Sequence, residues 1–166
     1  MSSPVRGRSR RALRLYAEPV PTFLIYGTFM SGQPGHENLD GARFLEQVET
    51  APEYRLYEVD GRWPALVEHD EGVTIAAELY EIEPAHIARL AEIEPPGWAR
   101  AAVRLADGRE VEAFLGAPAL RDRGHDVSQH GGWAAHRAAA TSPAAPFWNV
   151  ILPVATSTGF PATAFR

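Results

Sequence analysis

The sequence predicts an α+β fold, in which a mixed sheet is curled into a small β-barrel with a few flanking helices. Short apolar runs typical of strands make up most of the patterned part of the chain. Helical patterns occur singly, and the regular alternation of strand and helix that builds a doubly wound sheet is missing. With 166 residues, 45% of them hydrophobic, the chain is long enough to bury the core of one domain.

The expected strands follow from local patterns in chain order. The first, TFLIYG at residues 22–27, is a β-branched and aromatic run that ends in glycine and leads into a Gly- and Pro-rich loop. A hairpin is expected near the end of the series, because Ala106-Asp107-Gly108 separates two apolar runs. The remaining strands are expected at residues 54–59, 63–68, 73–80, 101–105 and 110–115.

Three helices are expected. Residues 42–48 place Phe44, Leu45 and Val48 on one helical face. Pro84 suits the first turn of a helix that runs to about Glu94, where two prolines and a glycine stop it. Ser128 is the expected cap of a last helix, from Gly131 to Ala139.

The predicted organisation has three parts. Residues 1–20 form a flexible segment crowded with arginines, for which an arm that binds nucleic acid or membrane is the alternative. Residues 21–141 form the domain. Residues 142–166 form a tail whose apolar patch, Phe147–Val154, is expected to dock on the domain in extended form.

Composition excludes several kinds of chemistry. The chain has neither cysteine nor lysine, which rules out disulfides, thiolate nucleophiles and Schiff-base lysines. The spacing of His125, His130 and His136 does not match the helical pair of a zinc site, so solvated histidines are expected. The net charge is −5, and no apolar run approaches the length of a transmembrane helix. We therefore expect a cytoplasmic protein with no nucleic-acid or membrane partner.

Glu94 is the leading candidate for an acid/base residue. It follows Ile87, Leu90 and Ala91 at helical spacings, so a carboxylate falls on the apolar stripe of the second helix. Burial raises the pKa of a carboxyl group toward neutral pH, as a general base requires. The alternative is that Glu94 lies at a frayed helix end and reaches water.

The end of the first strand is the second candidate. At Tyr26-Gly27-Thr28-Phe29 the chain passes from an apolar strand into a polar loop, which exposes backbone N–H groups that can bind a carboxylate or an oxyanion. Taken alone, such a segment usually marks a turn.

Together these features resemble the gamma-glutamylcyclotransferase-like superfamily. Tyr26-Gly27-Thr28 is similar to its strand-to-loop motif, and Glu78-Leu79-Tyr80 followed by a helix ending at Glu94 is similar to its Glu-x-Tyr and Leu-Asp-x-x-Glu pattern. Trp63-Pro64-Ala65 resembles a stretch of the gamma-glutamylamine, or AIG2-like, branch. Four residues depart from the family pattern: Phe29, Ala91, Trp98 and Phe114.

The resemblance implies an intramolecular reaction that releases 5-oxoproline and a free amine or amino acid from a small gamma-glutamyl substrate. Glu94 would be the catalytic acid/base. The implied substrate-binding residues are Tyr26, Gly27, Thr28, Phe29, Pro64 and Arg100. For Arg100 a salt bridge is the alternative. No metal and no cofactor are implied, and the protein is expected to be a monomer or a homodimer.

A second resemblance points to a different reaction on the same fold. Ser31-Gly32-Gln33-Pro34, Leu105 to Val111 and Asp126-Val127-Ser128 through Gly131-Gly132-Trp133 are similar to the C-terminal domain of allophanate hydrolase. That domain processes a carboxylated urea intermediate. The alternatives to a cyclotransferase are therefore an enzyme acting on a urea-derived carboxylate and a non-catalytic module that binds a small acid.

Overall fold

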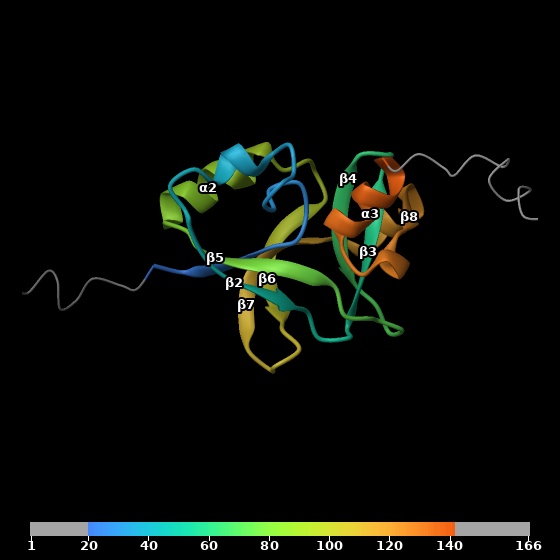
Figure 1. The fold of residues 1–166 in the computed structure, drawn as a ribbon. Helices are drawn as coiled ribbons and strands as arrows, with labels where there is room; N and C mark the ends of the chain where they lie inside the picture. Colours follow the sequence, from blue (N-terminus) through green and yellow to red (C-terminus); the bar gives the residue numbers. More distant parts are fainter. Residues whose placement is uncertain (1–19, 142–166) are drawn as a thin grey trace, which may run out of the picture. The chain divides into compact units, whose positions relative to one another are not determined.

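The structure, a computed structural model, describes residues 20–141 (Figure 1). Residues 1–19 and the tail 142–166, with its expected docking, lie outside the described residues. The chain divides into two units, residues 1–136 and 137–166. Of the second unit the structure describes residues 137–141, where the hydroxyl of Thr141 donates to the carbonyl of Arg137 at 3.1 Å.

Five strands form one mixed sheet. The pairing of β1 with β7 is parallel, although their paired residues Phe23 and Glu112 are far apart in the sequence. The other pairings are antiparallel. In spatial order the strands are β2 (Arg43–Glu49), β5 (Ala76–Glu81), β1 (Thr22–Ile25), β7 (Glu110–Gly116) and β6 (Trp98–Arg104).

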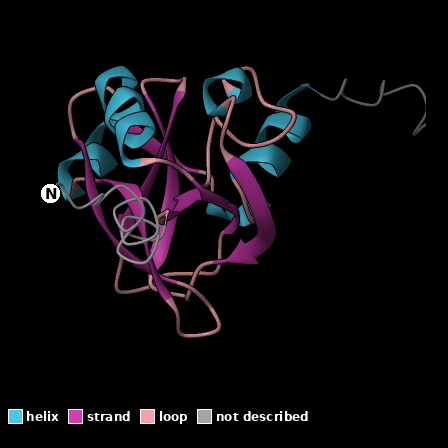
Figure 2. Ribbon diagram, turned by 90° about the vertical axis from the view of Figure 1, so that its left-hand side faces the viewer, coloured by secondary structure: helices cyan, strands magenta, loops and turns pink. Residues whose placement is uncertain are grey.

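Three further strands form a second, antiparallel sheet, in the order β4 (Trp63–Glu68), β3 (Tyr54–Val59) and β8 (Gly124–Asp126). The strands of both sheets are magenta in Figure 2. The described strands thus belong to two separate sheets that do not close into a barrel. The α+β class is as predicted, whereas the single barrel is not observed.

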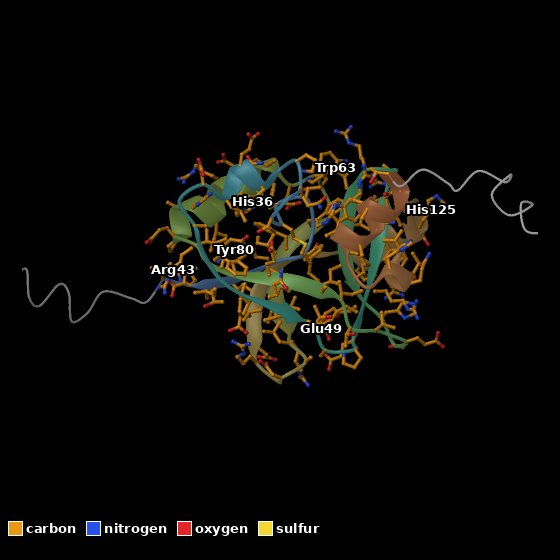
Figure 3. All side chains as sticks on the ribbon, viewed as in Figure 1. His36, Arg43, Glu49, Trp63, Tyr80 and His125 are labelled. Carbon is orange, nitrogen blue, oxygen red and sulfur yellow. The ribbon has the colours of Figure 1, made fainter. Side chains whose placement is uncertain are left out.

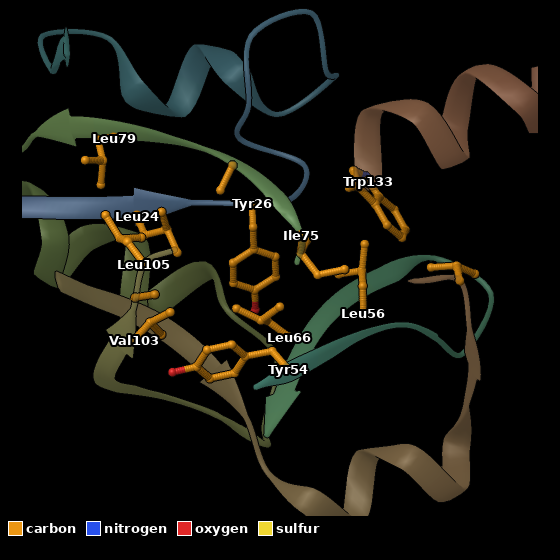
Figure 4. Packing of buried hydrophobic residues seen from close by; sticks show 13 residues of the cluster. Leu24, Tyr26, Tyr54, Leu56, Leu66, Ile75, Leu79, Val103, Leu105 and Trp133 are labelled. Carbon is orange, nitrogen blue, oxygen red and sulfur yellow. The ribbon is translucent and has the colours of Figure 1, made fainter. Parts of the chain in front are cut away.

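The main core lies between the two sheets. One face of the five-stranded sheet contributes Leu24 and Leu79, and the three-stranded sheet contributes Leu56 and Leu66, all at most 1% exposed (Figure 4). Trp133 closes this cluster. Each such leucine contributes about 1.5–3 kcal/mol by leaving water, so burial between the sheets is a principal source of stability.

Helix α2 (Pro84–Ile93) covers the opposite face of the five-stranded sheet. It begins with proline, as predicted, and buries Ile87 and Leu90 in a second cluster with Phe23, Ile25 and Tyr80 of the sheet. A 3₁₀ turn, η1 (His36–Leu39), adds Leu39 to the same cluster. This arrangement holds the end of α2 near the end of β1.

The predicted helix at 42–48 is wrong, since residues 43–49 form strand β2. Phe44 pairs with Tyr80 across the strands, and their rings lie 5.5 Å apart. A β-bulge between Phe44 and Glu46 breaks the alternation, so Leu45 and Val48 both pack against the main core. In the sequence, the three-residue spacing of Leu45 and Val48 is the same as that of two residues on one face of a helix.

The last helix also starts later than predicted. Helix α3 spans Trp133–Thr141, and Ser128 instead opens a short 3₁₀ turn, η3 (Ser128–His130), that ends at Gly131 with φ of 81°. The Ser128 hydroxyl accepts a hydrogen bond from the backbone N–H of Leu56 at 2.8 Å. It therefore ties this turn to β3 rather than capping a helix.

Candidate functional site

Six of the seven predicted site residues line one small cavity of about 50 Å³. The cavity lies where β1, β4, β7 and the end of α2 meet, and Trp63, labelled in Figure 3, borders it from β4. The six are Tyr26, Gly27, Thr28, Phe29, Pro64 and Glu94. Residues from both sheets and from the helical layer are thus needed to form it.

Glu94 is placed by the backbone that leaves α2. It is the residue after the last helical turn, with an extended backbone (φ −65°, ψ 136°), while its N–H still bonds the carbonyl of Leu90 at 3.3 Å. The predicted stripe is only partly observed, because Ile87 and Leu90 are buried but Ala91 is exposed. Glu94 therefore reaches the cavity as a helix cap, not as part of the helical stripe.

The surroundings of Glu94 favour its protonated form. Its carboxylate makes no hydrogen bond or ion pair with any residue of the described range 20–141. Burial raises the pKa of Glu94 to about 7, in a cavity that Ile93, Pro95 and Phe114 also line. A carboxyl group with this pKa can both take and return a proton near neutral pH.

Tyr26 is held in one protonation state beside it. Its hydroxyl donates to the carbonyl of Phe114 at 2.5 Å, and the side chain is buried. Burial, and then the negative charge of Glu94, raises the pKa of Tyr26 well above its ordinary value. Tyr26 therefore joins β1 to β7 and shapes the cavity, but it does not exchange a proton at neutral pH.

Gly27, just after β1, lies against Pro64 of β4 at this site. A Cβ atom on Gly27 would lie 2.4 Å from Cγ of Pro64, so only glycine fits. The carbonyl of Pro64 in turn accepts a hydrogen bond from Nε1 of Trp98 at 2.9 Å. These contacts fix β1, β4 and β6 relative to one another around the cavity.

The turn after Gly27 leaves two donors unused. The carbonyls of Gly27 and Thr28 accept bonds from the N–H groups of Met30 and Gly35, both at 3.0 Å. The carbonyl of Phe29 accepts a bond from Nδ1 of His36 at 2.8 Å. Within residues 20–141, by contrast, the N–H groups of Thr28 and Phe29 donate to no acceptor. They are suited to an anionic group of a ligand.

Arg100 is the one predicted site residue that the structure places elsewhere. It lies on β6, where its Nη2 atom is 2.6 Å from a carboxylate oxygen of Glu112, and both side chains are 45% exposed. This is the salt bridge that the sequence left as an alternative. The structure does not bring Arg100 to the cavity of Glu94.

Some residues of the site had no predicted role. Trp98 and Phe114 were noted only as departures from a family pattern, yet one bonds Pro64 and the other bonds Tyr26. Ile93 and Pro95 flank Glu94 and line the cavity. Their direct adjacency to the candidate base is a sequence feature that could have pointed to them.

The late histidines differ in their surroundings. His125, labelled in Figure 3, is exposed, as predicted. His136 is not solvated, because only 13% of its side chain is exposed and its Nε2 lies 2.7 Å from a carboxylate oxygen of Glu58. No group of three His, Asp or Glu residues that could hold a metal occurs among residues 20–141. Within the same range no helix is long and apolar enough to cross a membrane.

A second and larger cavity, of about 690 Å³, lies outside this site. It is bordered by β2, β5, the turn between β6 and β7, and the segment from His130 to Ala135. The buried carboxylate of Glu78 belongs to its lining. Sequence patterns assigned Glu78 no role of its own.

Comparison with known protein families identifies the family to which this chain belongs. The family model described as the allophanate hydrolase C-terminal domain matches residues 21–138. The chain belongs to this family. The match covers the whole described fold except its ends, including both cavities.

Individual relatives connect this family to the cyclotransferases. A Vibrio cholerae protein named "Putative gamma-glutamylcyclotransferase" is 37% identical over 70 residues, which span 42% of this chain and 58% of that protein. The match therefore covers little more than half of that relative. The resemblance to both families that the sequence motifs indicated is thus confirmed.

Solved structures show the same fold in two settings. A uropathogenic E. coli-specific protein superposes with a TM-score of 0.66 and 25% identity, over 74% of this chain and 98% of that one. Allophanate hydrolase from Kluyveromyces lactis gives a TM-score of 0.69 at 20% identity, over 75% of this chain but 22% of that one. The fold thus occurs both as nearly an entire chain and as a small part of a large enzyme.

Proposed function

We propose that the protein is a gamma-glutamylcyclotransferase that releases 5-oxoproline and a free amine or amino acid from a small gamma-glutamyl compound. The observation that carries this proposal is the carboxyl group of Glu94, which has no partner among residues 20–141 and whose pKa burial raises to about 7. Thr28 and Phe29, whose N–H groups donate to no acceptor in the same range, line the same cavity. The proposed partner is a small molecule, not a nucleic acid or a membrane.

The reaction needs one group that moves a proton twice. In the proposed mechanism Glu94 takes a proton from the substrate α-ammonium, and the resulting amine attacks the γ-carbonyl carbon, forming the new C–N bond. The tetrahedral intermediate then collapses: Glu94 returns the proton to the leaving nitrogen and the bond from that nitrogen to carbon breaks. The regenerated carboxylate takes the second proton of the ring nitrogen, and the departing amine carries that proton away as an ammonium group. Since attacker and target belong to one molecule, the protein mainly has to hold the folded conformer.

Binding is proposed to rest on the turn after Gly27. The N–H groups of Thr28 and Phe29 would receive the substrate α-carboxylate or the oxyanion of the intermediate. A gamma-glutamyl group is larger than the cavity volume of about 50 Å³. Binding therefore requires a side chain to move, and Ile93, which is 49% exposed at the rim, is the proposed one.

The test is release of 5-oxoproline from a panel of gamma-glutamyl amines and gamma-glutamyl dipeptides. Wild type is compared with Glu94→Gln, which keeps the shape of the side chain but cannot take a proton. The matched control is Glu92→Gln, an exposed glutamate two residues earlier. We expect turnover by wild type and by the control, and a loss of about 10²–10⁴-fold in Glu94→Gln.

Two outcomes would overturn the proposal. One is turnover by Glu94→Gln at the wild-type rate. The other is the absence of 5-oxoproline from every compound of the panel with folded wild-type protein.

A second candidate function is favoured by the family match over residues 21–138. The protein would then act on a urea-derived carboxylate, as the segment through Gly131-Gly132-Trp133 suggested. Allophanate, incubated with the same proteins and followed by ammonia and carbon dioxide release, distinguishes this activity from cyclotransfer. A non-catalytic module would bind small acids without turnover in either assay.

A further inference from the structure

The larger cavity has the dimensions of a small-molecule site. Its volume of about 690 Å³ lies within the range of about 300–1,000 Å³ that is usual for ligand pockets. Part of its wall is apolar and is formed by Met30, Val48 and Trp133. None of its lining residues lines the Glu94 cavity, so the two cavities are distinct.

A buried carboxylate lies in this wall. Glu78 is on β5 and is 3% exposed. Its Oε1 accepts a hydrogen bond from the backbone N–H of Ser31 at 2.7 Å and another from the hydroxyl of Tyr80 at 3.3 Å. Its Oε2 has no partner among the described residues, yet it is not sealed from solvent. One oxygen is therefore held in place, and the other is left without a hydrogen bond in a residue that lines the cavity.

Glu78 also lacks a counter-charge. No arginine or histidine of residues 20–141 forms an ion pair with it, and the donors on Oε1 are neutral groups. A buried carboxylate is costly unless a cation or a full set of hydrogen bonds compensates it. A positively charged ligand would therefore gain the most binding free energy by bonding to Oε2 of Glu78.

Most of the charges around the cavity are negative. Glu46, Glu49 and Asp107 line the cavity with Glu78, against the single arginine Arg109. Arg109 is already engaged, with its Nη2 at 2.9 Å from Glu46 and 2.7 Å from Asp107. Glu49, labelled in Figure 3, has no ion pair within the described part of the chain. The field in the cavity therefore attracts cations and repels anions.

We propose that this cavity is a binding site for a small organic cation, a primary amine or a guanidine on a short apolar body, whose charged group bonds Oε2 of Glu78. The apolar walls hold the body of the ligand, and Glu49 adds attraction at the opening. The site is separate from the proposed cyclotransferase centre and does not require that activity.

The test is titration calorimetry of the purified full chain with butylamine and with agmatine, at low ionic strength and neutral pH. 1-Butanol is the neutral probe of similar shape, and glutarate is the anionic one. Glu78→Gln keeps an oxygen for the bonds from Ser31 and Tyr80 but removes the charge. Glu81→Gln is the matched control, because Glu81 lies on the same strand and does not line the cavity.

We expect both amines to bind wild type and Glu81→Gln, and to bind Glu78→Gln about tenfold more weakly or worse. The amines should also bind more tightly than 1-butanol and glutarate. Equal binding to Glu78→Gln and wild type would overturn the proposal, and so would amines that bind no better than 1-butanol.

Two further variants keep the result interpretable. Ala135→Phe places a ring at an exposed position of the cavity wall without touching the hydrogen bonds of Glu78, and should also abolish amine binding. Undiminished binding to that variant would count against the site even if Glu78→Gln failed to fold. Glu94→Gln should bind amines as wild type does, so loss of cyclotransfer and loss of amine binding are separate results.

Discussion

At the scale of single residues, the most consequential one is Glu94, a carboxyl group left without a partner among the described residues. Its neighbours at the cavity are apolar, and burial alone accounts for its raised pKa. Such a group is costly to the fold when ionised. Because no described residue bonds the carboxyl group of Glu94, that group is free to exchange its proton with a substrate.

The pKa of Glu94 predicts a pH dependence of stability. The folded protein holds this proton up to about pH 7, whereas the unfolded chain releases it near its ordinary value of about 4.5. Between these values the folded state binds more protons, so stability is lost as pH rises through this window. We expect the free energy of unfolding of Glu94→Gln, relative to wild type, to rise by about 2–3 kcal/mol between pH 4.5 and pH 7.5.

Urea unfolding of both proteins at several pH values measures this difference. A difference that stays constant with pH would mean that Glu94 is solvated. The pH profile of turnover gives an independent check, because a base of this pKa makes kcat/KM rise with pH up to about 7.

The structure brings Glu94 to a cavity, but only partly by the route that the sequence predicted. The helical stripe predicted burial at Ala91, which is exposed, and the helix ends at Ile93. What brings Glu94 to the cavity is the extended backbone after the helix, which Pro95 directly after it favours. Arg100 shows the opposite case, since nothing in its local sequence reveals that Glu112 pairs with it across the hairpin.

At the scale of elements, the strands were easier to predict than their neighbours. Strands β3 and β4 have the predicted bounds, because alternation and turn residues are local features. Strand β2 was predicted as a helix, because a bulge gives its core residues a helical spacing. Ser128 looked like a cap, but its partner is the N–H of Leu56, a contact over 72 residues that no local pattern encodes.

The contact between the end of β1 and β4 predicts the effect of one substitution. Gly27→Ala places a Cβ 2.4 Å from Cγ of Pro64, so we expect a loss of about 1–3 kcal/mol in the free energy of unfolding, together with loss of activity. Pro64→Ala removes that Cγ atom. The double variant should therefore be more stable than the sum of the two single effects.

Denaturant unfolding of the four proteins of this cycle measures the interaction. Strictly additive losses would show that Gly27 and Pro64 do not meet as described. The single variant Pro64→Ala measures how much the free energy of unfolding falls when proline is replaced and Gly27 is kept.

At the scale of the whole molecule, the fold class was predictable and the sheet topology was not. The list of strands in the sequence does not say that β1 pairs in parallel with β7, nor that the strands divide into two sheets. These pairings join segments far apart in the chain, and burial between the sheets selects them. Motif resemblance indicated the family, because it carries information on long-range arrangement that composition lacks.

The turn after Gly27 serves both cavities, and this has a consequence for regulation. Phe29 lines the Glu94 cavity, Met30 lines the other, and the N–H of Ser31 binds Glu78. If a ligand in one cavity shifts the whole turn, it also shifts residues of the other cavity, and such allosteric coupling is reciprocal for binding free energies. We expect butylamine to change the Kd of Glu94→Gln for a gamma-glutamyl substrate without competing for its site, and the substrate to change the Kd for butylamine by the same factor. Titration calorimetry of that variant with each ligand in the presence of the other would reveal this, and affinities that the second ligand leaves unchanged would show that the turn does not couple the two cavities.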